Sequence, residues 1–226
     1  MPAPAFHADR LSLESDGAEH FPAALGAAEL EALDRASTLA PGKPGRRLEP
    51  GMGLRALLGG PDAIAASLLG PAARPVRAML LDKNRGRNWA LGWHQDRTIA
   101  LRARRPVHGF GAWTVKAGIV HAEPPFPLLE RMLTLRVHLD PAGPDNAPLM
   151  IVPGSHRLGR IAEPDIPGIA ERHEPFACLA DAGDIWAYAS TILHASERAS
   201  APARRRVLQL SYSADDLPGG LEWLGV

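Results

Sequence analysis

The sequence predicts a mainly β chain with flanking helices, of the α+β class, whose strands form a sandwich or barrel. From about Pro75 onward, short apolar runs are separated by Gly, Pro, Asp and Asn, which is typical of short strands joined by turns. Helical patterns precede these runs rather than alternating with them, and this order argues against a parallel α/β sheet. A length of 226 residues fits a single domain, residues 1–226, of this class.

Residues 1–72 are expected to form a helical N-terminal elaboration of that domain. Within residues 21–39, three leucines recur at helical spacing among alanines and acidic residues, as in an amphipathic helix. These are Leu25, Leu30 and Leu33. Pro and Gly residues then break the pattern. A second helix is predicted to begin at Pro61, since proline suits a first helical turn, and to end near Gly70.

Residues 73–226 are expected to form the β core. The predicted strands cover residues 76–81, 132–139, 149–152, 185–188 and 207–212. In the second of them, apolar residues alternate with Thr134, Arg136 and His138, so one face should be apolar and the other polar. Residues 102–131 are less regular, and we expect an insertion that forms a lid or a binding loop.

Composition excludes several classes of protein. The formal net charge is zero and no long Lys/Arg run occurs, so nucleic acid is not an expected partner. Cys178 is the only cysteine, which rules out an intramolecular disulfide and suits a reducing compartment. The chain shows neither a signal peptide nor about 18 consecutive apolar residues. We therefore expect a cytoplasmic protein that does not enter the membrane.

The most informative segment is Trp93-His94-Gln95-Asp96. In an extended strand, residues two apart face the same side, so His94 and Asp96 can bind one ion together. Two histidines and one carboxylate are the ligands of non-haem Fe(II) oxygenases. His194, which follows a predicted turn and strand, is the best candidate for the second histidine. Arg205 begins the next strand, and its planar guanidinium matches a carboxylate such as that of a 2-oxo acid.

Several short motifs, in this order and spacing, resemble the phytanoyl-CoA dioxygenase family of Fe(II)/2-oxoglutarate oxygenases. The resemblance covers roughly Met79 to Tyr212. Its motifs are His94-Gln95-Asp96, Asn146-Ala147-Pro148-Leu149, Val152-Pro153-Gly154-Ser155-His156, Gly183-Asp184, His194-Ala195-Ser196 and Arg205. The resemblance implies a double-stranded β-helix, which is a cupin-like jelly roll, with helices packed outside.

The resemblance also implies roles for residues of this chain. Its iron ligands would be His94, Asp96 and His194. The distal carboxylate of 2-oxoglutarate would bind Arg205, with Ser196 as a helper hydroxyl and Met79 lining the pocket. Arg136 stands where many relatives carry Trp beside the cosubstrate. With O₂, such an enzyme would hydroxylate a small organic substrate and release succinate and CO₂. Halogenating relatives lose the carboxylate ligand, so Asp96 favours hydroxylation or a related oxidation.

Candidate substrate residues lie in the insertion and before the metal strand. They are Trp113, Lys116, His121 and Lys83. A cleft with aromatic side chains and one or two cations would suit a small anionic or polar substrate. Alternatively, the aromatic side chains only anchor the loop to the barrel.

Other residues have structural interpretations. His156 resembles a ligand, but a structural role in its turn is favoured, and Asn146 either contacts substrate or caps a turn, with the turn favoured. His138 lies near the pocket or at the core edge. Alternation places Arg204 and Arg206 on the face opposite to Arg205.

Two other functions remain open at this point. One is a cupin-like metalloprotein that acts without 2-oxoglutarate, and the other is a non-catalytic binding relative that keeps only the fold. The intact His–Asp–His set and the Arg205–Ser196 pair favour the oxygenase.

Overall fold

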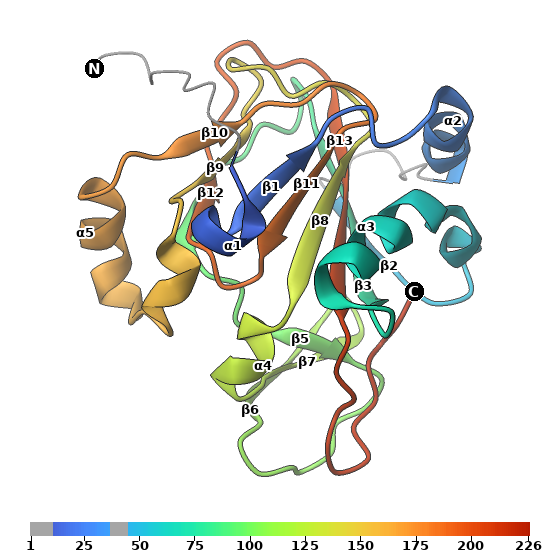
Figure 1. Ribbon diagram of the computed structural model, residues 1–226, viewed down its shortest axis with the longest axis vertical. Coiled ribbons are helices and arrows are strands. Elements are labelled where there is room, and N and C mark those ends of the chain that lie inside the picture. Colours follow the sequence, from blue (N-terminus) through green and yellow to red (C-terminus); the bar gives the residue numbers. More distant parts are fainter. Residues whose placement is uncertain (1–10, 37–44) are drawn as a thin grey trace.

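Two antiparallel sheets face each other in the computed structural model, which describes residues 11–36 and 45–226 (Figure 1). The larger sheet has the strand order β1, β11, β8, β13, β3 and β2. Their bounds are β1 Ala18–Phe21, β11 Ile185–Ala189, β8 Leu133–His138, β13 Arg205–Ser213, β3 Arg74–Lys83 and β2 Gly45–Leu48. Every pair in this sheet is antiparallel.

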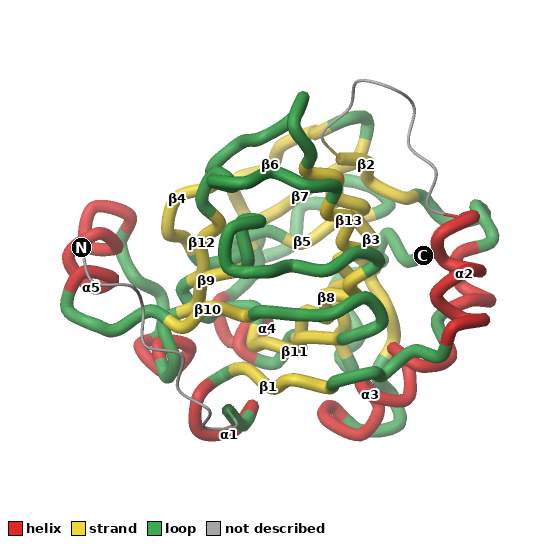
Figure 2. Tube along the Cα trace, turned by 90° about the horizontal axis from the view of Figure 1, so that it is seen from above, coloured by secondary structure: helices red, strands yellow, loops and turns green. Residues whose placement is uncertain are grey.

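The smaller sheet lies opposite and has the order β10, β9, β12 and β4 (Figure 2). Its strands are β10 Phe176–Cys178, β9 Leu149–Ile151, β12 His194–Ser196 and β4 Leu91–His94. Leu149 and Ile151 of this sheet pack against Trp186 and Tyr188 of the larger one. This pairing of two antiparallel sheets confirms the expected jelly-roll fold.

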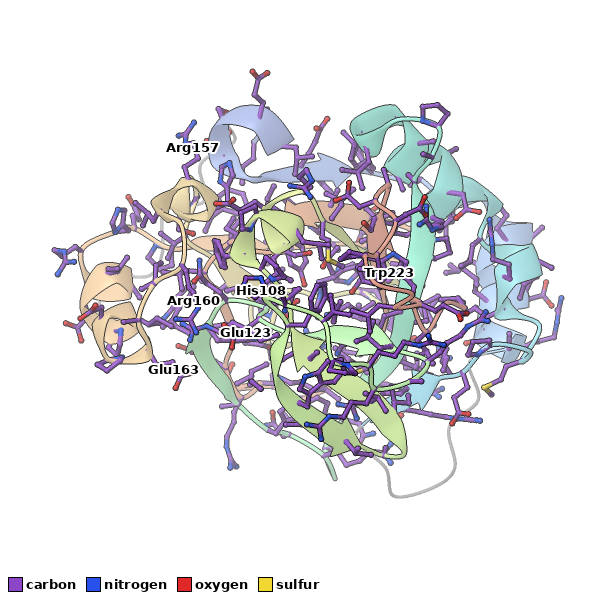
Figure 3. The ribbon with its side chains drawn as sticks, turned by 90° about the horizontal axis from the view of Figure 1, so that it is seen from below. His108, Glu123, Arg157, Arg160, Glu163 and Trp223 are labelled. Carbon is purple, nitrogen blue, oxygen red and sulfur yellow. The ribbon has the colours of Figure 1, made fainter. Side chains whose placement is uncertain are left out.

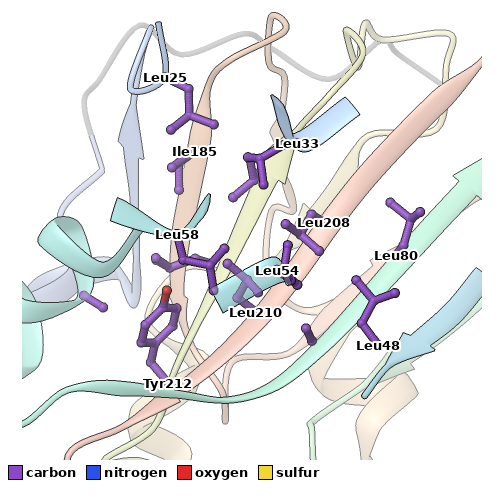
Figure 4. Close-up of a cluster of buried hydrophobic side chains, with 14 of the residues drawn as sticks. Leu25, Leu33, Leu48, Leu54, Leu58, Leu80, Ile185, Leu208, Leu210 and Tyr212 are labelled. Carbon is purple, nitrogen blue, oxygen red and sulfur yellow. The ribbon is translucent and has the colours of Figure 1, made fainter. Parts of the chain in front are cut away.

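Helices cover the outer face of the larger sheet. Leucines from β8 and β13 pack there against Leu33, Leu54 and Leu58 (Figure 4). Burying this many leucine side chains supplies the main driving force for folding. The helices are α1 Leu13–Asp16, α2 Ala27–Ala36, α3 Gly59–Leu69, α4 Phe126–Glu130 and α5 Ile166–Glu171, with 3-10 turns η1 Leu54–Leu57, η2 Ser155–Leu158 and η3 Glu163–Asp165.

The alternation in β8 is confirmed. Its apolar side chains face the hydrophobic core under the helices, and its polar side chains face the space between the two sheets. Leu133, Leu135 and Val137 belong to the outer hydrophobic core. Thr134, Arg136 and His138 point the other way and are also buried. Since they cannot reach bulk water from there, the polar residues of β8 line a space between the two sheets.

The predicted helix over residues 21–39 is wrong at its start. Residues up to Phe21 form β1, and α2 begins only at Ala27; residues 37–39 lie outside the described residues. Pro22 follows Phe21, and the residue before a proline disfavours the helical region. The helix predicted from Pro61 is confirmed, although α3 begins two residues earlier, at Gly59.

The region 102–131 is more regular than expected. It contains β6 Gly111–Lys116, β7 Ile119–Glu123 and the helix α4, and β5 Ile99–Leu101 completes a third antiparallel sheet. Ala117 and Gly118 form a two-residue turn with φ values of 52° and 82°. Such a turn needs two left-handed residues and normally carries Asn or Gly. The alanine therefore concealed the hairpin in the sequence.

Membrane insertion has no support among the helices of the described residues. None of them is long and apolar enough to cross a bilayer.

Candidate metal centre

Three ligand side chains meet on the smaller sheet. His94 ends β4 and His194 begins β12, and the two residues are directly opposed across the strand pair. Asp96 lies two residues beyond His94, where its backbone N–H donates to the Ser190 carbonyl at 3.3 Å. One ligand atom from each side chain lies within 4.8 Å of the other two. A single ion placed between them would touch all three.

Backbone carbonyls orient both imidazole rings. Nδ1 of His94 lies 2.8 Å from the Gly92 carbonyl, and Nδ1 of His194 lies 3.0 Å from the Ile192 carbonyl. A carbonyl only accepts, so each neutral ring carries its proton on Nδ1. This leaves the lone pair of each Nε2 for a metal, the arrangement that metal-binding histidines usually show.

Burial keeps His194 in its neutral form. The side chain is almost fully buried, and this burial, reinforced by the neighbouring His94, lowers the pKa of His194 to about 4. Asp96 opposes the shift without reversing it. A neutral imidazole is the form that binds a metal ion, so protons do not compete for His194 at neutral pH.

Gln95, between the two ligands, fixes the loop that carries Asp96. Its Nε2 donates to the carbonyls of Thr191 at 2.7 Å and Gly159 at 3.0 Å. Its Oε1 accepts from the Ile161 N–H at 3.0 Å. All of the polar atoms of this buried amide therefore bind backbone groups.

Replacing Gln95 with Leu should destabilise the protein and loosen the metal site. The change leaves a buried N–H and two carbonyls without their partner, which costs about 1–3 kcal/mol for an unsatisfied buried group. Urea denaturation of the metal-free protein would measure this loss. Gln209→Leu is the comparison: it also deprives a buried group, Arg136, of its acceptor and should lower stability, but Gln209 holds no metal-ligand loop and Fe(II) affinity should be unchanged. Equal stability of wild type and Gln95→Leu would contradict the role of Gln95.

A second group of polar residues lies beside the ligands. Arg205 is 1% exposed; its Nη1 donates to the Ala147 carbonyl, while its Nε has no partner in the part of the chain that the structure describes. Ser196 donates to the same carbonyl at 3.2 Å. Lys83, opposite Arg205 in the register of β3 and β13, donates to the Ser196 hydroxyl at 2.8 Å. The motif residues Arg205 and Ser196 thus meet, and Lys83 joins them.

These buried cations have no counter-ion among the described residues. Burial, together with Arg136, lowers the pKa of Arg205 to about 9. Burial also lowers the pKa of Lys83 to about 7, with contributions from Arg205 and Arg136. Leaving charges unpaired inside a protein is costly, so this corner is built to receive an anion.

The family follows from a sequence comparison. The model of the family described as phytanoyl-CoA dioxygenase matches residues 54–207. The chain belongs to the phytanoyl-CoA dioxygenase family. Membership implies a 2-oxoglutarate-dependent oxygenase or a related enzyme, with Fe(II) as the metal and 2-oxoglutarate and O₂ as cosubstrates. No curated protein matches the chain.

Solved structures share the fold. EctD from S. alaskensis, in its apoform, has a TM-score of 0.64 at 20% identity, with 99% of this chain and 86% of that one covered. The epimerase SnoN, in complex with Fe3+, alpha ketoglutarate and nogalamycin RO, has a TM-score of 0.61 at 19% identity, with 92% of this chain and 88% of that one covered. HygX from Streptomyces hygroscopicus, with nickel and 2-oxoglutarate bound, has a TM-score of 0.56 at 17% identity, with 89% of this chain and 84% of that one covered.

The residues present fit the cofactors of the phytanoyl-CoA dioxygenase family. Two imidazole nitrogens and one carboxylate suit Fe(II) with open coordination positions. The unpartnered Nε of Arg205 and the neighbouring Lys83 suit the carboxylate of a bound acid. Both halves of the expected cosubstrate site therefore lie in one space between the sheets.

Arg136 and Met79 lie deeper on the inner face of the larger sheet. Arg136 donates to Gln209 at 3.1 Å, and Gln209 is paired with Met79 in the next strand. The positive charge of Arg136 acts on Tyr188, whose ring centroid lies 5.4 Å from that of His194. The arginine that stands in place of the family tryptophan is thus buried near the candidate metal ligands.

The arginines that flank Arg205 are not in this space. Arg206 forms ion pairs with Asp34 and with Asp140, the latter at 2.7 Å. Arg204 is exposed. The predicted alternation across residues 204–206 is confirmed, and only Arg205 faces the interior.

The candidate substrate residues separate in the structure. Trp113 packs against the core of the third sheet and lies 5.6 Å from the Arg104 guanidinium, so it anchors the hairpin. Lys116 is exposed near the hairpin turn. His121 is 1% exposed and its Nε2 has no partner. Lys83 lies with Arg205 and Ser196, and its Nζ is 5.1 Å from the centroid of the Trp89 ring.

The remaining motif residues serve the scaffold. Asn146 accepts from the Ala203 N–H at 3.1 Å and closes the turn before Arg205. His156 lies against Gly17, where an added Cβ would be 2.3 Å from its Nδ1. Glu123 instead pairs with Arg160 at 2.7 Å, which joins the hairpin to the loop after η2 (Figure 3).

Arg47 and Arg77 were missed by the sequence analysis. Arg47 pairs with Met79 across β2 and β3, and Arg77 lies on the same face of β3. Nothing in the local sequence distinguishes them from surface arginines. Only the sheet register places them on the inner face of the larger sheet.

Proposed function

We propose that this chain is an Fe(II)- and 2-oxoglutarate-dependent hydroxylase of a small organic substrate, with release of succinate and CO₂. His94, Asp96 and His194 would bind the iron, and Arg205 with Ser196 would bind the distal carboxylate of 2-oxoglutarate. The observation that carries this proposal is the three-ligand cluster, within 4.8 Å, beside the buried Arg205, which has no counter-ion among the described residues.

The residues of the chain would act by holding the metal and the cosubstrate and by orienting the metal ligands. When bound, Fe(II) would supply the chemistry by which O₂, with 2-oxoglutarate as co-reductant, oxidises a substrate C–H bond. The carbonyls of Gly92 and Ile192 keep both imidazoles in the metal-binding tautomer. Lys83 would add a second cation beside Arg205, so its proposed role is to bind the cosubstrate rather than the substrate. Asp96 occupies the carboxylate position, which leaves no gap for a halide and supports hydroxylation over halogenation.

An anaerobic titration of the metal-free protein with Fe(II) and 2-oxoglutarate tests this proposal. We expect a weak visible charge-transfer band, because it forms only when the acid chelates bound iron. His94→Ala should abolish the band. His173→Ala is the matched control, since His173 is exposed and its Nδ1 bonds only its own helix at Ile169.

Each outcome of the titration has a definite meaning. Iron binding without the band would leave a cupin-like metalloprotein that does not use 2-oxoglutarate. Absence of both would leave a non-catalytic relative. A band in the wild type should be followed by succinate release once a substrate is found.

A further inference from the structure

The inner face of the larger sheet carries an unusual set of basic residues. Five cations from β2, β3, β8 and β13 have no carboxylate within ion-pair distance among the described residues: Arg47, Arg77, Lys83, Arg136 and Arg205. Among arginines nearer the periphery, Arg74 and Arg131 pair with Asp216 and Asp215. Lys83, Arg136 and Arg205 are buried and Arg47 and Arg77 are half-buried, so this face concentrates positive charge that would favour bound anions.

The cosubstrate accounts for only one end of this face. Lys83 and Arg205 lie opposite each other where β3 ends and β13 begins. Arg77 lies on the same face of β3 toward its other end, roughly 20 Å from Lys83 at about 3.3 Å per residue. A five-carbon diacid held at Arg205 and at the metal ligands does not reach that far. Arg47 and Arg77 remain for a second anion.

A pocket lies beside Arg47, and Arg77 contacts Met79, one of its lining residues. Its volume is about 310 Å³, and Arg47, Met79, Leu81 and Trp89 are among its lining residues. Arg47 is directly opposite Met79 in the strand register. The Nη2 of Arg77 lies 4.0 Å from the Met79 sulfur, so both guanidinium groups approach the same side chain. Methionine and tryptophan offer apolar contact, while the arginines offer charge.

His121, on β7, has a buried acceptor that no described residue uses. Its Nδ1 lies 2.9 Å from the Ile119 carbonyl, to which it donates, and its buried Nε2 has no partner. Burial lowers the pKa of His121, and the charges of Arg77 and Arg47 lower it further. The ring is therefore neutral, and its Nε2 can accept a hydrogen bond from a hydroxyl or amine of a ligand.

We propose that Arg47 and Arg77 bind an anionic group of the substrate, a carboxylate or a phosphate, in the pocket beside Met79 and Trp89. The inference rests on the proposed function, because it names the substrate class of the same active site. Two guanidinium groups suit such oxygens through paired hydrogen bonds. Arg136, whose partner Gln209 is paired with Met79 across β13 and β3, would add positive charge beside this pocket.

Calorimetric titration with inorganic phosphate, and separately with acetate, tests this proposal. The protein is first saturated anaerobically with Fe(II) and 2-oxoglutarate, so that Arg205 is already occupied. One of the two anions should bind the wild type, and the stronger one indicates the group that the substrate carries. Arg47→Met and Arg77→Met should each weaken binding by about tenfold to a hundredfold, as expected for one charged hydrogen-bonding partner.

Controls separate this proposal from loss of the fold and from the proposed function. Arg85→Met removes an exposed arginine and should leave anion binding unchanged. Arg47→Met and Arg77→Met should keep the charge-transfer band, which shows that iron and 2-oxoglutarate still bind. If neither anion binds the wild type, or if both variants bind as tightly as it does, the anion site is refuted. Anion binding that depends on Arg47 and Arg77 in a protein without the band would refute only the proposed function.

Discussion

Replacing Arg205 with Met is expected to raise the Kd for 2-oxoglutarate by roughly 30- to 3000-fold. That range corresponds to the 2–5 kcal/mol that the loss of one partner of a buried charge pair costs. Arg205 is 1% exposed and has no carboxylate partner in the described residues, so the acid itself would be its counter-ion. The charge-transfer band, followed over a range of 2-oxoglutarate concentrations, measures the change.

The stability of the same variant separates this role from a structural one. In the metal-free protein, Arg205→Met loses the bond to the Ala147 carbonyl, about 1 kcal/mol, but it also removes a buried and unpaired charge. We therefore expect a free energy of unfolding within about 1 kcal/mol of the wild type, or higher. Arg206→Met should instead lower it by about 1–3 kcal/mol, because Arg206 pairs with Asp34 and Asp140. An Arg205 variant that unfolds easily but binds 2-oxoglutarate normally would reverse our assignment.

Replacing Asp96 with Asn should weaken Fe(II) binding by more than about 100-fold, since loss of an outer partner of a ligand alone costs 10–100-fold. The amide keeps the shape of the side chain but removes the negative charge between His94 and His194. Anaerobic equilibrium dialysis measures the Kd for Fe(II), and succinate release should become undetectable.

Asp165→Asn is the control for this change, because Asp165 is an exposed carboxylate at the start of α5. It should bind Fe(II) like the wild type. Wild-type affinity in Asp96→Asn would mean that another group completes the site.

The sequence predicted the parts of the fold that have strong local patterns. The alternation from Leu133 to His138 identified β8 and the face that it turns to the core. The hairpin of β6 and β7 was missed because Ala117 occupies a left-handed position without the usual turn residue. The first helix was placed too early because the alanines that follow Pro22 resemble helix more than turn.

The metal ligands were predictable because their chemistry is concentrated in short motifs. His94 and Asp96 are two residues apart, and few other residue types bind Fe(II). Arg47 and Arg77 were not predictable, because their importance depends on the register between β2, β3 and β13. The proposed role of Lys83 changed from binding substrate to binding cosubstrate for the same reason, because only the strand register shows that it lies opposite Arg205.

The two carbonyl contacts of the histidines have a consequence for the choice of metal. Because Gly92 and Ile192 hold the rings before any ion arrives, the binding energy is not spent on ordering the ligands. Nickel, copper and zinc bind such nitrogen and oxygen donors more tightly than Fe(II) does. Affinity alone therefore does not select Fe(II) at this site, and its loading in the cell also depends on which free ion is available.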